Sequence, residues 1–288
     1  MSTFHASARR LRAASAACAA AALLATAVAL PTSAFAGGSA KFVLGPPGNP
    51  ETVTRHYGAG VFSDLLSYQS SSGPVFSVEM YLIGRPDGKT GAKAFVSANA
   101  ATIAQVAVTN VLQRYTLQPP AGASFAGGRL VLYAALAGAD VRDHGTLDLG
   151  LDVRAYRGAS WEARNSGQRT VDDQAGSEEV EFAVVVDLPA TLDSAQSVSV
   201  DMTMSLTATA NIPPSGGAVQ FSIADAYYGG GRVAAFRVLN AAGAQVTGFK
   251  LSAGGSSIEE RLPPPSGQVR AIEYFHPAFD HYFVTANA

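Results

Sequence analysis

Apolar and polar residues alternate one by one over several stretches of the chain. The longest alternation covers residues 198–209, where apolar side chains take the even positions and Ser, Asp or Thr take the odd ones. Shorter alternations of the same kind cover 76–82, 147–153 and 180–188. Weaker examples lie at 129–136, 219–223, 233–239 and 246–251. Successive side chains of a β-strand point to opposite faces, so a period of two indicates strands with one buried and one solvated face.

Glycine and proline separate these runs. Residues 85–89 (Arg-Pro-Asp-Gly-Lys) predict a turn, because Pro presets φ and Gly supplies a positive φ. Residues 213–217 and 229–231 carry similar signals. A short helix is conceivable over 98–111, but its Thr, Ile and Val residues favour a strand. Runs of about 8–12 residues closed by turns predict an all-β fold over 37–262, an antiparallel β-sandwich that is one large or two small units.

Two segments interrupt the alternation, and a third, at the C-terminus, is rich in aromatic residues. Residues 160–177 are mostly polar and predict a loop. Residues 263–268 are rich in Pro and predict a stiff linker. Within 269–288, two aromatic runs at 272–275 and 281–285 flank a Pro-containing turn, which predicts a C-terminal β-hairpin.

The first 36 residues have the three parts of a bacterial signal peptide. A region with three arginines precedes an apolar stretch at 13–30, and Ala34-Phe35-Ala36 forms an Ala-x-Ala cleavage site. We therefore expect a protein that is secreted or periplasmic, with no membrane span after cleavage. Cys18, the single cysteine, lies in this segment, so the exported chain has no disulfide and no thiol chemistry.

The charge balance of the exported chain bears on whether it binds nucleic acid. Removal of 1–36, which carry three arginines and no acidic residue, leaves 17 basic and 22 acidic residues. The basic residues form no cluster along the sequence. Because contact with nucleic-acid phosphates needs a Lys/Arg patch, nucleic acid is not an expected partner.

The C-terminal segment resembles a short repeat of the form V-E-Y-Y-H-x-x-F-D-H-Y-F-x-T-A. Its matching residues are Ile272, Glu273, Tyr274, Phe275, His276, Phe279, Asp280, His281, Tyr282, Phe283, Thr285 and Ala286. This repeat occurs at the C-termini of secreted proteobacterial proteins and has no established activity, so the resemblance implies secretion and a modular chain. In similar proteins an acidic, helix-like stretch follows. Here the sequence stops at Ala288, which predicts a degenerate or truncated final copy.

The larger body resembles, in pattern alone, the β-sandwich ectodomains of secreted bacterial surface proteins. The stretch that carries this likeness begins at Asp225-Ala226-Tyr227-Tyr228 and runs to Gly254-Gly255. The resemblance implies an extracellular location for the body and assigns no residue a role.

Two groups of side chains are candidates for binding a metal ion. The tail supplies His276, Asp280 and His281, which suit zinc if they converge beside the hairpin turn. The alternative is that Asp280 and His281 hydrogen-bond the turn backbone. A second group suits calcium, although alternation places part of it on a solvated strand face. It consists of Asp140, Asp143, Asp148 and Asp152, with His144 among them. Neither group matches a metal-binding motif, so no cofactor is expected.

Four aromatic residues are candidates for stacking on a sugar ring. Trp161, the single tryptophan, follows Tyr156 in a polar region, and Tyr227-Tyr228 precede a glycine-rich turn. An aromatic ring covers the apolar face of a sugar, and neighbouring polar groups bond its hydroxyls. The alternative for each is ordinary packing, because large aromatics bury much apolar area.

Enzyme signatures are absent from the sequence. It contains no G-x-S-x-G and no H-E-x-x-H. Glu178, Glu179 and Glu181 are close enough in sequence to supply paired carboxylates for glycoside hydrolysis, and 179 and 181 share a strand face. We expect a non-catalytic extracellular protein that binds or structures surface material, with polysaccharide as the partner. The alternatives are a secreted jelly-roll hydrolase using Glu179 or Glu181 and a purely structural, self-associating subunit.

Overall fold

The computed structural model contains β-strands and connecting turns. It describes residues 37–70, 73–122, 124–173, 180–193, 196–214, 216–263, 272–276 and 281–285. The predicted signal peptide, most of the predicted linker and parts of the C-terminal segment lie outside these ranges. In the described ranges, no helical segment has the length and apolar character that crossing a bilayer requires.

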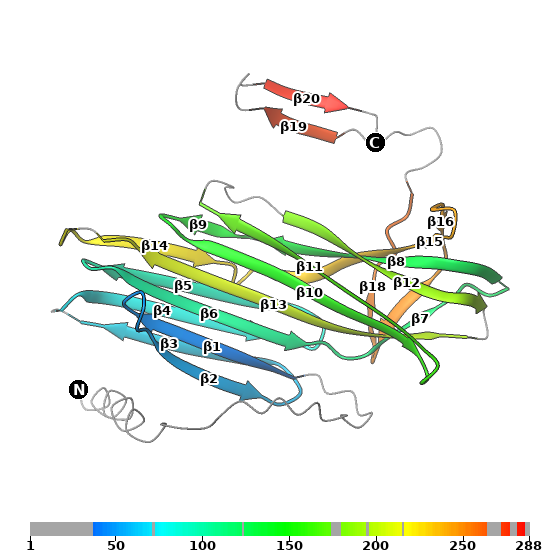
Figure 1. Cartoon of the computed structure of the whole chain (residues 1–288), viewed down its shortest axis with the longest axis horizontal. Coiled ribbons are helices and arrows are strands. Elements are labelled where there is room, and N and C mark those ends of the chain that lie inside the picture. The colour runs from blue at the N-terminus through cyan, green and yellow to red at the C-terminus, as the bar shows by residue number, and fades with distance from the viewer. Residues whose placement is uncertain are drawn as a thin grey trace. The chain divides into compact units, whose positions relative to one another are not determined.

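Eighteen strands of the described body form two antiparallel sheets (Figure 1). Sheet A contains β1 (Gly37–Gly45), β2 (Glu51–Tyr57), β6 (Thr102–Val111), β7 (Tyr115–Gln118), β10 (Thr146–Arg157), β11 (Trp161–Asp172), β13 (Val198–Ile212), β17 (Lys250–Ala253) and β18 (Ser256–Ile258). Sheet B contains β3 (Phe62–Gln69), β4 (Val75–Gly84), β5 (Thr90–Ala98), β8 (Ser124–Ala137), β9 (Asp140–Arg142), β12 (Val180–Asp193), β14 (Gln220–Asp225), β15 (Gly230–Asn240) and β16 (Gln245–Val246).

Strand β13 shows why the alternation produces this fold. Its even-numbered residues from Val198 to Ile212 are at most 1% exposed, whereas its odd-numbered residues keep part of their surface. One edge of β13 pairs with β10, and the other pairs with β6 and β7 in succession. The inward side chains of both sheets form one continuous core cluster. The all-β sandwich prediction is confirmed, and the core makes it one large sandwich.

Sheet B consists of two parts joined at a narrow point. Strands β3, β4, β5, β14 and β9 lie side by side in that order, as do β12, β8 and β15. The two parts meet where Gly231 of β15 pairs with Thr90 of β5. A β-carbon at Gly231 would lie 2.3 Å from the end of the Leu149 side chain of sheet A, so any larger residue here would displace Leu149 from its place in the core.

The predicted turn at 85–89 is present and connects β4 to β5. Gly88 has a φ of +99°, and its N–H donates to the Arg85 carbonyl over 3.0 Å. The buried side chain of Asn110 on β6 donates to the Arg85 carbonyl and to the Thr90 hydroxyl, each over 3.0 Å. This polar contact across the core fixes the turn of sheet B to sheet A.

The loop predicted over 160–177 is wrong for most of its length. Residues Trp161–Asp172 form β11, which pairs with β10 along its whole length. Strand β11 is an edge strand, so most of its side chains meet solvent on both faces and the strand has no clean alternation. Within the 98–111 stretch, by contrast, Thr102–Val111 form the expected strand, β6.

The C-terminal hairpin is also present. Strands β19 (Ile272–His276) and β20 (His281–Thr285) pair in an antiparallel register that sets Tyr274 opposite Phe283. The body and this hairpin together give the predicted fold class.

Candidate functional site

Three tyrosines contact one another on the outer face of sheet B, and we call them the tyrosine platform. Tyr81 projects from β4, while Tyr227 and Tyr228 lie in the turn after β14. The rings of Tyr81 and Tyr227 lie 5.8 Å apart, and those of Tyr227 and Tyr228 lie 5.0 Å apart, edge to face. Tyr228 is 82% exposed, so its ring is available to a ligand.

Backbone packing holds the turn that carries Tyr227 and Tyr228. The N–H of Tyr227 donates to Asp225 Oδ1 over 2.9 Å, and the N–H of Ala226 donates to the Ala92 carbonyl over 2.8 Å. The turn crosses β5 so closely that a β-carbon at Gly91 would lie 2.4 Å from the Tyr227 carbonyl oxygen. This segment is therefore set before any ligand arrives, which lowers the entropic cost of binding.

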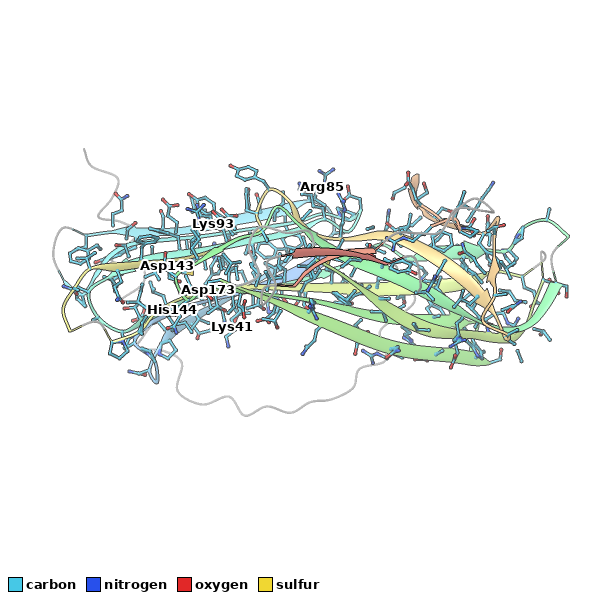
Figure 2. The ribbon with its side chains drawn as sticks, turned by 90° about the horizontal axis from the view of Figure 1, so that it is seen from above. Lys41, Arg85, Lys93, Asp143, His144 and Asp173 are labelled. Atoms are coloured by element: carbon cyan, nitrogen blue, oxygen red, sulfur yellow. The ribbon has the colours of Figure 1, made fainter. Side chains whose placement is uncertain are left out.

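Charged groups lie beside the rings. The register Tyr81↔Lys93↔Asp225 puts the Lys93 ammonium 5.6 Å from the centre of the Tyr81 ring. Lys93 Nζ lies 3.4 Å from Glu79 and 3.8 Å from Asp225. These ion pairs are long and partly exposed, so both carboxylates keep the capacity to accept further hydrogen bonds. Figure 2 shows Lys93 on one side of the molecule and Lys41 on the opposite side.

Tyr81, Lys93 and Asp225 form a row of cross-strand neighbours, and the strand register extends this row to both sides of the platform. Asp140 on β9 lies opposite Asp225, and a hydrogen bond from Arg142 to Asp140 over 2.7 Å raises the pKa of that guanidinium. Leu65 on β3 lies opposite Tyr81. Rings that cover apolar surface, carboxylates that accept and an ammonium that donates are the groups that recognise a polyhydroxylated ring.

The structure separates the four aromatic residues predicted to bind ligand. Tyr227 and Tyr228 belong to the platform. Tyr156 lies on the outer face of sheet A, with the guanidinium groups of Arg114 and Arg154 5.1 and 5.3 Å from its ring centre. Burial and the nearby Asp201 carboxylate raise the pKa of Tyr156.

Trp161 lies apart from both the platform and Tyr156, on β11 of sheet A. It begins β11, pairs with Arg157 and packs, partly buried, against the core cluster. Its position matches the packing role that the sequence analysis left open. Ligand binding by Tyr156 or Trp161 stays a prediction.

Of the carboxylates considered for hydrolysis, Glu181 is the one that the structure describes. Both carboxylate oxygens of Glu181 accept hydrogen bonds from the guanidinium of Arg261, one of them over 2.7 Å. The same bonds raise the pKa of Arg261. Glu178 and Glu179 lie outside the described residues. An ion-paired Glu181 is poorly placed to exchange protons with a substrate.

The predicted calcium ligands are dispersed over strands and a turn. Asp148 accepts a hydrogen bond from Thr170, and Asp152 is paired with Arg164 at 3.2 Å. The backbone N–H of His144 donates to Asp173 over 3.0 Å (Figure 2). Asp140 has Arg142 as its partner, as described above. Over the described ranges, no three His, Cys, Asp or Glu side chains gather where they would share a metal ion.

The predicted zinc ligands of the tail are only partly described. The hairpin register sets His276 directly opposite His281, while Asp280 lies outside the described residues. The zinc site therefore stays a prediction.

Sequence reasoning missed Tyr81, Lys93, Glu79 and Asp225 as a group. Their sequence positions span almost 150 residues, and the strand order β4-β5-β14 brings them together. The available signal was the alternation itself, because Glu79 and Tyr81 take the outward positions between the buried Val78, Met80 and Leu82.

Comparisons with known proteins give distant likenesses. No family model matches the chain, and no curated protein matches it. One similar solved structure comes from work on the promiscuous specificity of carbohydrate-binding modules of the β-sandwich superfamily. It is 12% identical, covers 67% of this chain and 84% of its own, and has a TM-score of 0.19. A structure of an infectious bursal disease virus strain is 10% identical, covers 81% and 72%, and has a TM-score of 0.14. Likenesses of this size carry no argument about what this chain binds.

Proposed function

We propose that this chain is an exported, non-catalytic protein that binds extracellular polysaccharide through the tyrosine platform. The signal-peptide pattern of residues 1–36 supports export. The exposed ring of Tyr228, packed edge to face on Tyr227, is the observation that carries the binding proposal. An exposed aromatic residue of this size in a supported turn is typical of a binding surface.

The chemistry of the platform favours a sugar over a purely apolar ligand. Glu79, Lys93 and Asp225 surround the rings with hydrogen-bonding groups that are partly exposed. A sugar ring offers C–H faces to the tyrosines and hydroxyls to these charged groups, so both halves of the site are used. A hydrolase using Glu181 has less support, because Arg261 occupies that carboxylate.

The test is retention of the purified, exported chain on insoluble polysaccharides and by affinity electrophoresis in gels that contain soluble ones. We expect retention by at least one polymer, and Tyr228→Ala to weaken it by about tenfold, which corresponds to ~1.4 kcal/mol. Tyr228 makes few contacts, so this variant should unfold at the wild-type temperature.

Matched variants separate the platform from other surfaces. Val219→Ala removes another exposed apolar side chain and should leave retention unchanged. Trp161→Ala and Tyr156→Ala test the other two aromatic candidates. Absence of retention on every polymer, or loss that follows Trp161→Ala but not Tyr228→Ala, would contradict the proposal.

A further inference from the structure

Strand β3 is an edge strand that presents apolar side chains to solvent. Among the described strands it pairs only with β4. Val61, which precedes it, is 66% exposed, and Leu65 and Tyr68 are 48% and 47% exposed. An edge strand carries a row of backbone N–H and C=O groups that another strand can bond.

The other long edge strands of the body are guarded by charge. They are β2 with Glu51 and Arg55, β11 with Glu162, Arg164, Arg169 and Asp172, and β12 with Glu181, Asp187 and Asp193. Strand β12 also contains Pro189 at a register shift, which further disfavours pairing. Strand β3 carries one charged residue, Asp64, and its carboxylate is bonded by Arg55 and by Tyr57 at 2.8 Å. Strand β3 therefore has less protection against edge-to-edge pairing than the other long edge strands, because its one carboxylate is already bonded within the chain.

We propose that β3 pairs antiparallel with β3 of a second copy of this chain, about a twofold axis at Leu65. This register sets Leu65 opposite Leu65 of the other copy and Phe62 opposite Tyr68. Asp64 then lies opposite Leu66 of the other copy, so the single carboxylate of each strand does not face its equivalent. Residues of the same parity lie opposite one another, which keeps the buried face and the solvent face of the two sheets continuous.

A second copy is favoured over an unrelated strand, because the β3 edge is complementary to itself and can form both sides of a twofold interface. It also extends the outer-face row Lys93–Tyr81–Leu65 directly into the same row of the other copy. If the tyrosine platform binds polysaccharide, the dimer presents two platforms on one face, and a polymer can engage both. The pairing itself does not depend on that activity.

The first test is sedimentation velocity of the whole exported chain over a range of concentrations. An interface of one short strand is small, so we expect a dimer at about 10–100 µM that dissociates on dilution. Leu65→Lys should be monomeric throughout, while Thr170→Lys on the β11 edge should behave like the wild type. A wild type that stays monomeric up to about 1 mM, or a Leu65→Lys dimer, would overturn the proposal.

The second test fixes the register by cross-linking. Because the exported chain lacks the segment that carries Cys18, Leu65→Cys introduces its single thiol and should form an intermolecular disulfide on mild oxidation. Ser67→Cys faces Ser63 of the other copy and should form at least tenfold less. Stronger cross-linking through Ser67→Cys would refute the twofold at Leu65, even if a dimer is present.

Discussion

The outer faces of the two sheets use their polar and aromatic residues differently. On sheet A, cross-strand partners satisfy one another: Arg164 pairs with Asp152, Arg154 with Glu162, and Thr170 bonds Asp148. The aromatic ring on this face, Tyr156, lies against two guanidinium groups. On sheet B, Tyr133 also lies against two guanidinium groups, those of Arg237 and Arg261. The platform differs, because Tyr81, Tyr227 and Tyr228 contact one another and Tyr228 projects into solvent.

This difference shows which face retains capacity for a ligand. A side chain that already has a close partner of opposite charge gains little from an added hydrogen bond and must first lose the bond it has. Long, partly exposed ion pairs such as Lys93–Asp225 cost little to rearrange. The contrast therefore supports our proposal that a ligand binds at the platform rather than on the outer face of sheet A.

The largest expected effect comes from adding a methyl group to the glycine beneath the platform turn. Gly91→Ala places a β-carbon 2.4 Å from the backbone carbonyl oxygen of Tyr227, which cannot move without shifting the platform turn. We expect a loss of about 2–3 kcal/mol, a fall of roughly 4–12 °C in unfolding temperature, and weaker polysaccharide retention. Thermal denaturation monitored by circular dichroism measures the first two.

Gly150→Ala on sheet A is the matched control. Its β-carbon would meet the Ser205 hydroxyl at 2.5 Å, and that oxygen can rotate away. We expect a change of less than about 1 kcal/mol and unchanged retention. Equal losses from both variants would mean that the platform turn is not the more rigid structure.

Removing one cation from each face tests the contrast in ion pairing. Arg114 bonds both oxygens of Asp201, at 2.8 and 3.2 Å, and this raises the pKa of the arginine. Arg114→Ala should cost about 1–2 kcal/mol, because it leaves a half-buried carboxylate alone. Lys93→Ala should cost less than about 0.5 kcal/mol. Urea denaturation compares them, and a larger cost at Lys93 would reverse our assignment of the faces.

A third prediction concerns Asp64 on β3 of sheet B, which accepts hydrogen bonds from Arg55 and Tyr57 on β2 of sheet A. Burial acts to raise the pKa of Asp64, but hydrogen bonds from Tyr57 and Arg55 outweigh it and leave that pKa below its ordinary value. Burial and the Asp64 contact raise the pKa of Tyr57. A lowered carboxyl pKa stabilises the fold above the unfolded value, about 4, and this contribution is lost as pH falls through the folded value.

Asp64→Asn should therefore cost about 1–2 kcal/mol at pH 7, and the difference from wild type should shrink as the pH falls below about 4. Urea denaturation at a series of pH values measures it. The control is Asp187→Asn on the β12 edge, an exposed position where the substitution should cost less than about 0.5 kcal/mol at pH 7. A difference that stays constant from pH 7 to pH 3 would exclude the ionised carboxylate as its source.

The smallest effect is a gain in stability at the corner between β9 of sheet B and β10 of sheet A. Asp143 and His144 have φ values of 50° and 67°, and the Gly145 N–H donates to the Arg142 carbonyl over 3.1 Å. Such a turn favours Asn followed by Gly. Asp143→Asn combined with His144→Gly should add about 1 kcal/mol and raise the unfolding temperature by roughly 2–4 °C. His144→Ala alone should not, and a destabilised double variant would refute this account of the corner.

The sequence predicted strands with one buried face, including the edge strand β12, and missed β11, which is exposed on both faces. Strands β10 and β13 were anticipated because one face of each is buried, which forces strict alternation. Strand β11 was assigned to a loop because an edge strand has no such constraint on most of its length. For the site, Tyr227 and Tyr228 were predicted from a glycine-rich turn, while Tyr81 and Lys93 were not, since nothing in their local sequence distinguishes them from other outward-facing residues.

For strands with one buried face, the sequence by itself determined the local elements: where these strands lie, which side of each is apolar, and where Gly and Pro turn the chain. Those features follow from the backbone geometry of a few neighbouring residues. The tertiary structure decided strand order and register, and with them which outward side chains become neighbours. The rings of Tyr81 and Tyr227 meet because β4, β5 and β14 lie side by side. Pairing between distant strands depends on the whole core, so local sequence does not specify it.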